Sequence, residues 1–116
     1  MKHHLYLQIA SKLRTTILRG DYAPEQQIPS IRRLAENEKC NPATVQKAMK
    51  VLEEQNLVTS CGTLGYFVIA SEQELKELRY QESNKLVKIL FEKLGELGFS
   101  EDEIVNLFLE KMLRRS

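Results

Sequence analysis

The stretch 27–57 constrains the fold most, because it has the pattern of two short helices joined by a tight turn. Ser30 is expected to cap the first helix, since a Ser at this position accepts a hydrogen bond from an otherwise unpaired backbone N–H. This helix should run to about Lys39. Asn41 and Pro42 then start the second helix, because Asn caps well and Pro is pre-set for the first helical turn.

The second helix has one apolar and one polar side. Its apolar residues recur at steps of three and four, so they must face a core: Val45, Ala48, Met49 and Leu52. The residues left pointing outward are Ala43, Thr44, Gln46, Lys47 and Lys50. Thr and Gln can bond base edges in a major groove, and Lys attracts phosphate. Two interpretations remain at this point: a DNA-reading helix, or a hairpin of helices whose outer face is simply solvated.

Segments on either side of the helix pair complete a winged arrangement. A helix is predicted over 5–18, with an apolar stripe formed by Tyr6, Ile9, Leu13 and Ile17. Two β-prone runs, 57–59 and 66–69, follow the pair and predict a hairpin. Three helices and a hairpin make a winged helix-turn-helix, in which the turn, or wing, lies against the DNA backbone or minor groove. We therefore expect a DNA-binding domain over 1–70.

The remainder, 71–116, is predicted to form a helical dimerisation region. A long helix should break at 95–100, and Ser100 with Glu103 forms a capping box for the next helix. Two helices cannot cover all their apolar surface by themselves, so they either fold back on the first helix or pack against a second copy. We expect these helices to pack against a second copy of the protein. The residues expected at that interface are Leu86, Val87, Leu90, Leu94, Leu107 and Phe108.

Charge divides unevenly along the chain. The formal net charge is only +1, but residues 1–71 hold nine Lys or Arg against six Asp or Glu, while residues 72–116 hold eight against ten. This division fits a DNA-facing front part and a tail that faces something else. The chain has neither an apolar run of about 18 residues nor a signal-peptide pattern, so we expect a soluble, cytoplasmic protein without a membrane partner.

No catalytic or metal-binding constellation can be assembled. His3 and His4 lie at the terminus without a third ligand, and we give them no role. Cys40 and Cys61 belong to no zinc-binding pattern, so free thiols that are buried or half-buried are expected. The acidic residues at 101–103 have two interpretations. They could attract a cation, or they could simply stabilise the start of a helix, where the helix dipole favours carboxylates. We therefore predict neither an enzyme nor a cofactor.

Two motifs within this pattern are shared with a known family. PSxRxLA occupies residues 29–35 and NPxTVQKA occupies residues 41–48, and the hairpin follows at the expected distance. Together the segments over about 5–70 resemble the N-terminal DNA-binding domain of the GntR family of bacterial transcription regulators. The short tail resembles that of the YtrA-like subfamily, whose C-terminal part is a small helical dimerisation unit.

The resemblance implies particular DNA contacts. Arg32 would contact bases or phosphates with a geometry suited to guanine, and Ser30 would touch the DNA backbone. Gln46 stands where many relatives have Arg, so the base preference there should differ. The complete set of predicted DNA-binding residues is Ser30, Arg32, Asn41, Thr44, Gln46, Lys47, Lys50, Thr63 and Gly65.

The wing departs from the family pattern. Relatives commonly carry a basic pair followed by Gly-x-Gly, whereas residues 61–65 of this chain are CGTLG. Gly62 and Gly65 either contact DNA or simply allow a positive φ in the turn. Because the wing lacks positive charge, we expect a lower affinity for DNA or a shallower salt dependence.

The function that the resemblance implies is a homodimeric repressor, with no enzymatic activity, acting on double-stranded DNA. It would place two recognition helices on an inverted-repeat operator with half-sites one helical turn, roughly 34 Å, apart. A small-molecule effector is left open: no ligand constellation occurs in the tail, and any pocket would lie between the tail helices and the DNA-binding part. The alternative is a winged-helix protein-interaction module without operator binding, which the neutral wing favours.

Overall fold

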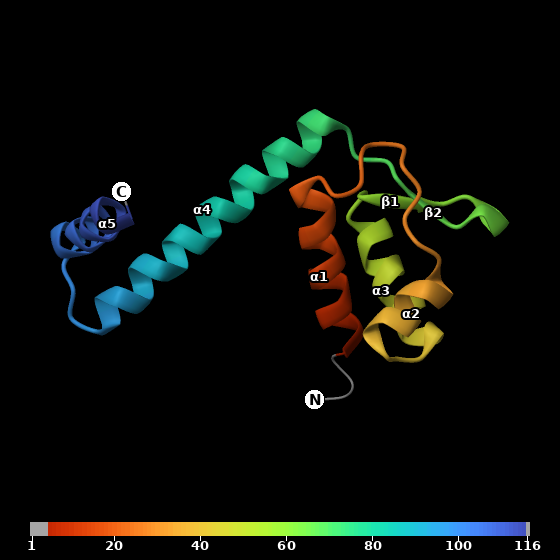
Figure 1. The fold of residues 1–116 in the computed structure, drawn as a ribbon, viewed down its shortest axis with the longest axis horizontal. Helices are drawn as coiled ribbons and strands as arrows, with labels where there is room; N and C mark the ends of the chain where they lie inside the picture. The colour runs from red at the N-terminus through yellow and green to blue at the C-terminus, as the bar shows by residue number, and fades with distance from the viewer. Residues whose placement is uncertain (1–4, 116) are drawn as a thin grey trace. The chain divides into compact units, whose positions relative to one another are not determined.

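The computed structural model describes residues 5–115 and is mainly helical, with one small antiparallel sheet. This confirms the predicted fold class. The elements, shown in Figure 1, are α1 (Leu5–Arg19), α2 (Ile31–Glu38), α3 (Pro42–Glu54), β1 (Val58–Ser60), the 3-10 helix η2 (Gly62–Leu64), β2 (Tyr66–Val68), α4 (Glu72–Glu96) and α5 (Glu101–Arg115). The chain forms two compact units, of which the first runs to Arg79 and the second begins at Tyr80.

Helices α1 and α3 pack together at the centre of the first unit. The predicted apolar positions of α3 are all fully buried, and those of α1 are buried except for Tyr6, which is half-buried. Each fully buried Leu, Ile or Met side chain contributes roughly 1.5–3 kcal/mol relative to exposure. The packing of these two stripes therefore fixes which side of α3 faces solvent.

Side-chain caps begin α2 and α3 at the predicted residues. The Ser30 hydroxyl oxygen accepts a hydrogen bond from the backbone N–H of Arg33 at 3.1 Å. Asn41 Oδ1 accepts one from the backbone N–H of Ala43 at 2.8 Å. Between the helices, Lys39 adopts the left-handed conformation with φ +54°, which turns the chain sharply enough for α3 to start three residues later.

Replacing Lys39 with Gly is expected to stabilise the fold by about 0.5–1 kcal/mol, because Gly adopts a left-handed conformation without the steric cost of a Cβ. Urea unfolding of both proteins measures the difference. The matched control is Lys50→Gly, also exposed but within α3, which should destabilise by about 1 kcal/mol. A Lys39→Gly protein no more stable than the wild type would contradict this account of the turn.

The loop before α2 pairs with the hairpin. Strands β1 and β2 are antiparallel, with Val58 opposite Val68. The backbone N–H of Ile28 donates to the Tyr66 carbonyl at 2.9 Å, and that of Val68 donates to the Gln26 carbonyl at 3.0 Å. No local pattern in the sequence predicts this pairing. The pairing of the loop with β2 attaches the wing directly to the start of α2.

The beginning of α4 belongs to the first unit. Leu75 is buried in the core, and Arg79 Nη1 donates to the Leu18 carbonyl at the end of α1, at 2.6 Å. A capping box that was not predicted from the sequence starts the helix: Glu74 Oε1 accepts from the Ser71 N–H at 2.9 Å, and the Glu74 N–H donates to the Ser71 hydroxyl at 3.1 Å. These bonds lower the pKa of Glu74.

The second unit contains the rest of α4 and α5. The predicted capping box is confirmed, because Glu103 Oε1 accepts from the Ser100 N–H at 2.9 Å and the Glu103 N–H donates to the Ser100 hydroxyl at 3.2 Å. The rings of Phe91 and Phe108 lie 6.5 Å apart between centroids. Helix α4 continues to Glu96, so the break between the helices is shorter than predicted: Gly95 lies inside the helix, where a glycine costs about 1 kcal/mol relative to alanine without ending the helix.

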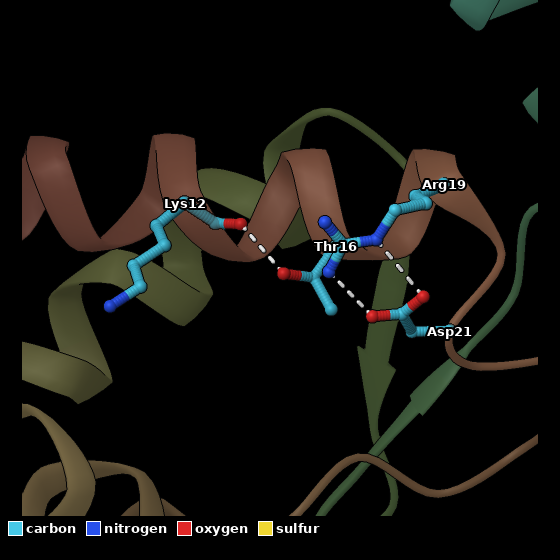
Figure 2. A network of polar contacts seen from close by, with 4 residues as sticks. All are labelled: Lys12, Thr16, Arg19 and Asp21. Atoms are coloured by element: carbon cyan, nitrogen blue, oxygen red, sulfur yellow. Dashed lines mark hydrogen bonds and ion pairs between the residues drawn. The ribbon is translucent and has the colours of Figure 1, made fainter.

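An ion pair closes the end of α1, as Figure 2 shows. Arg19 Nε and Nη2 donate to the two carboxylate oxygens of Asp21 at 3.0 and 2.6 Å. The Thr16 carbonyl accepts from the Asp21 N–H at 3.2 Å, while its hydroxyl donates to the Lys12 carbonyl at 3.0 Å. The hydrogen bond from Arg19 holds the pKa of Asp21 below its ordinary value.

This pair predicts a small pH-dependent stability difference between the wild type and Asp21→Asn. Because the folded-state pKa of Asp21 is lowered, its contribution is fully present above the unfolded-state pKa and disappears as pH falls through the folded-state pKa. Thermal unfolding midpoints should therefore favour the wild type at pH 7 and converge as the pH falls below 3.8, the ordinary pKa of an Asp side chain, through the lowered folded-state pKa. A constant difference across this range would show that the carboxylate charge is not responsible.

Two negative findings apply to the described residues. Between residues 5 and 115 no helix has the length and apolar character needed to cross a membrane. The same part of the chain holds no cluster of three or more His, Cys, Asp and Glu side chains suited to a metal ion. His3 and His4 lie outside the described residues.

Candidate nucleic-acid interface

The starts of α2 and α3 each present a capping side chain to solvent. Both Ser30 and Asn41 are exposed, and each uses an oxygen atom for its cap. The Ser30 hydroxyl hydrogen and the Asn41 amide NH₂ group are donors that these caps do not use. Helix N-termini also favour anions because their backbone N–H groups and dipoles point outward. Both positions can therefore receive a phosphate.

Arg32 lies beside the start of α3. It lines one surface recess together with Asn41 and Pro42, and its side chain is exposed. No hydrogen bond or ion pair engages its guanidinium within residues 5–115. The neighbouring Arg33 lines a different recess, with Ser30. An unengaged guanidinium at this place can bond a guanine edge or a phosphate with two parallel N–H groups.

The outer face of α3 is polar, as predicted. Gln46, Lys47 and Lys50 are exposed, whereas Thr44 is half-buried at the edge of this face. The Lys47 Nζ atom lies 5.9 Å from the centroid of the Tyr6 ring, a cation–π arrangement that draws this side chain toward α1. Tyr6 was predicted only as part of the apolar stripe of α1, and its contact with Lys47 was not predicted.

The wing is an ordered turn. Gly62 and Gly65 both have positive φ, +60° and +96°, so the conformational role proposed for these glycines is confirmed. Gln27 Nε2 donates to the Leu64 carbonyl, and a Cβ added at Gly65 would lie 3.4 Å from that same nitrogen. No sequence pattern singles out Gln27. Thr63, the other predicted wing contact, is exposed.

The two cysteines are both free, but their burial differs. Cys40 is half-buried, as predicted. The prediction for Cys61 was wrong, because this thiol is exposed. It lies at the start of the wing turn, where no core residue covers it.

Some of the predicted contacts lie near one another in the first unit, in two recesses along α2. Arg32 shares its recess with Asn41 at the start of α3. Ser30 shares a second recess with Gln27, which in turn bonds the wing at Leu64. The start of α2 therefore links the recognition helix to the wing. This combination of a capped helix pair, a polar outer face on the second helix and a hairpin defines a winged helix-turn-helix DNA-binding domain.

Comparisons with known proteins specify the class further. Residues 5–68 match the family described as bacterial regulatory proteins, gntR family. The chain is 26% identical to the helix-turn-helix-type transcriptional regulator YhcF of Bacillus subtilis, over 87% of this chain and 84% of YhcF. It is 33% identical to the transcriptional repressor YtrA of the same organism, over 55% of this chain and 49% of YtrA.

Solved structures show the same architecture. A GntR family transcriptional regulator from Listeria monocytogenes has a TM-score of 0.83 at 24% identity and covers 91% of this chain and 93% of its own. The DNA-binding domain of AraR in complex with operator ORR3 has a TM-score of 0.53 at 30% identity and covers 54% of this chain and 76% of its own.

The chain belongs to the GntR family. It is a DNA-binding transcription regulator with a winged-helix fold, and its relatives are transcription regulators rather than enzymes.

Proposed function

We propose that this protein is a homodimeric repressor that binds an inverted-repeat operator. The observation that carries the proposal is the position of the unengaged Arg32 beside Asn41, at the exposed start of α3. In this proposal α3 lies in the major groove, where Thr44, Gln46 and Arg32 meet base edges and phosphates. Ser30, Asn41, Lys47 and Lys50 supply phosphate contacts, and Thr63 and Gly65 bring the wing to the adjacent groove.

The second unit supports dimerisation because it has almost no core of its own. As far as that unit is described, Ile104 is its one buried side chain, at 1% exposure. Leu86, Val87, Leu90 and Phe108 remain exposed, and Leu94 and Leu107 are half-buried. Two helices with a single buried side chain do not form a stable unit alone. We therefore assign DNA binding to residues 1–70 and dimerisation to the tail, 71–116, through the part of it that lies in the second unit beyond Arg79.

A heptad spacing gives the proposed interface a geometry. Tyr80, Val87 and Leu94 recur every seven residues along α4, and Leu90 is followed at the same spacing by Leu97, just beyond the end of the helix. Residues spaced in this way lie on one side of a helix and suit packing against a second, similar helix. Two copies joined along this seam would bring together two DNA-binding domains, the number that an inverted repeat requires.

Repression is the regulatory direction that the relatives favour. YtrA is a transcriptional repressor, and the AraR domain of similar fold is bound to operator DNA. A dimer seated on an operator that overlaps a promoter blocks transcription by occupancy. No step of this mechanism needs a cofactor.

Recovery of fragmented genomic DNA on the full-length protein, at low and near-physiological salt, tests the proposal. Enrichment of a few sites that share an inverted repeat would support it and identify the regulated genes. If DNA fragments were retained only at low salt and shared no sequence, the binding would be non-specific attraction to phosphate, and the operator proposal would be wrong. If no duplex is retained at either salt, the protein-interaction module becomes the better interpretation.

A further inference from the structure

The tip of the wing is apolar where a charged contact to DNA would be expected. The turn between β1 and β2 extends away from α1 and α3 (Figure 1). Residues 60–65 contain no Lys or Arg. Instead, the turn carries Leu64, whose side chain is 65% exposed. This wing cannot attract phosphate by charge, so any contribution it makes to DNA binding must have another chemistry.

Leu64 is held in place by bonds on both sides of the turn. The Cys61 N–H donates to the Gly65 carbonyl at 2.8 Å, and the Leu64 N–H donates to the Cys61 carbonyl at 3.1 Å. Gln27 Nε2 donates to the Leu64 carbonyl, and Gln27 itself forms a backbone bridge with Phe67. The exposed leucine is therefore displayed on a fixed backbone.

We propose that Leu64 is an apolar wedge that enters the DNA minor groove beside each half-site, and that Gln27 is the residue that positions it. The proposal rests on the proposed operator binding. Apolar side chains in the minor groove partly unstack a base step and kink the duplex. Pyrimidine–purine steps, above all TA, unstack at least cost, so the wing would select such a step. The wing then adds sequence preference outside the bases that α3 reads.

An apolar wedge differs from a basic wing in its effect on the salt dependence of DNA binding. Burial of a Leu side chain releases no counterions, so loss of Leu64 should weaken binding without changing the slope of log affinity against log salt. A cation at the same position should steepen that slope by about 0.9, the value for one added phosphate contact. Substitutions at Leu64 alone can therefore distinguish apolar insertion from phosphate attraction by the salt dependence of binding.

Selection from a pool of random-sequence duplexes is the first test, with the wild type, Leu64→Ala and Ile69→Ala compared. Ile69 is a matched control, since it is apolar and 48% exposed but lies beyond β2, outside the turn. The wild type and Ile69→Ala should both select an inverted repeat flanked by a pyrimidine–purine step. Leu64→Ala should select the same repeat without that flank, with about tenfold weaker affinity.

Outcomes of this selection separate the two proposals. If the wild type and Leu64→Ala select identical flanks with equal affinity, the wedge is overturned while operator binding stands. If no variant selects a repeat, operator binding itself has failed. Leu64→Lys should restore affinity at low salt only, with the steeper slope; an unchanged slope would also count against the proposed position of this residue in the groove.

A spectroscopic signal tests insertion directly. 2-Aminopurine placed at the flanking step of a selected duplex fluoresces more strongly when it is unstacked. The wild type and Ile69→Ala should raise this fluorescence on binding, and Leu64→Ala should not. Gln27→Ala should reduce the rise while leaving the selected repeat unchanged, because only the positioning of the wing is lost. Equal fluorescence with all four proteins would overturn the wedge.

Discussion

Val87→Glu is expected to convert the dimer into monomers, with at least a hundredfold weaker dimer affinity. Val87 is 51% exposed on the seam of α4, so a second copy would cover it in the proposed dimer. Burial of a carboxylate without a partner costs several kcal/mol, which exceeds what a single apolar contact supplies. Light scattering coupled to size-exclusion chromatography measures the mass directly.

Lys88→Glu is the matched control for this substitution. Lys88 is the next residue along the helix and is also exposed, but it is charged already and lies away from the heptad positions. The control should remain dimeric, and both variants should keep the helix content of the wild type by circular dichroism. If Val87→Glu also eluted as a dimer, the seam on α4 would not be the interface.

Loss of the dimer should also weaken operator binding by at least a hundredfold. When two DNA-binding domains are joined, the second half-site is bound at an effective concentration near the millimolar range. A monomer lacks this gain and retains only the affinity of one domain for one half-site. Fluorescence anisotropy with a duplex recovered from genomic DNA measures the loss, and near-equal binding by Val87→Glu and the wild type would show that a single domain suffices.

The sequence predicted the helix pair well because its signals are local. The caps at Ser30 and Asn41 depend on residues two or three positions away, and the burial of Val45 follows from helical periodicity alone. The structure of the loop at 25–28 could not be predicted from local signals. Its pairing with β2 joins residues about forty positions apart, so it depends on the assembled core.

In the candidate site, too, the local features could be predicted from the sequence and the tertiary contacts could not. That α3 turns a polar face outward could be predicted from spacing, but the contact between Lys47 and Tyr6 depends on how α1 crosses α3. Gln27 carries no motif, and its role follows only from the approach of the wing to its amide. The exposure of Cys61 was misjudged because small apolar residues are usually buried, whereas a projecting turn offers no neighbours to bury one.

Arg32→Ala should weaken operator binding by roughly ten- to a hundredfold, the value of one bidentate contact to guanine. The guanidinium lies in the recess with Asn41, at the start of the recognition helix, and has no partner within residues 5–115 that its removal would leave unpaired. Its loss should therefore leave the fold and the dimer unchanged. Anisotropy titrations against a recovered operator and against single-base variants measure both affinity and base preference.

Arg33→Ala removes the same charge from the neighbouring residue and separates base reading from phosphate attraction. Arg33 is exposed but lines a different recess, with Ser30, to which Asn41 does not contribute. Its loss should lower affinity less and leave the base preference intact, whereas Arg32→Ala should relax the preference at one position of each half-site. If both variants weakened binding equally for every sequence, Arg32 would be a phosphate contact, and base reading would rest on the α3 residues alone.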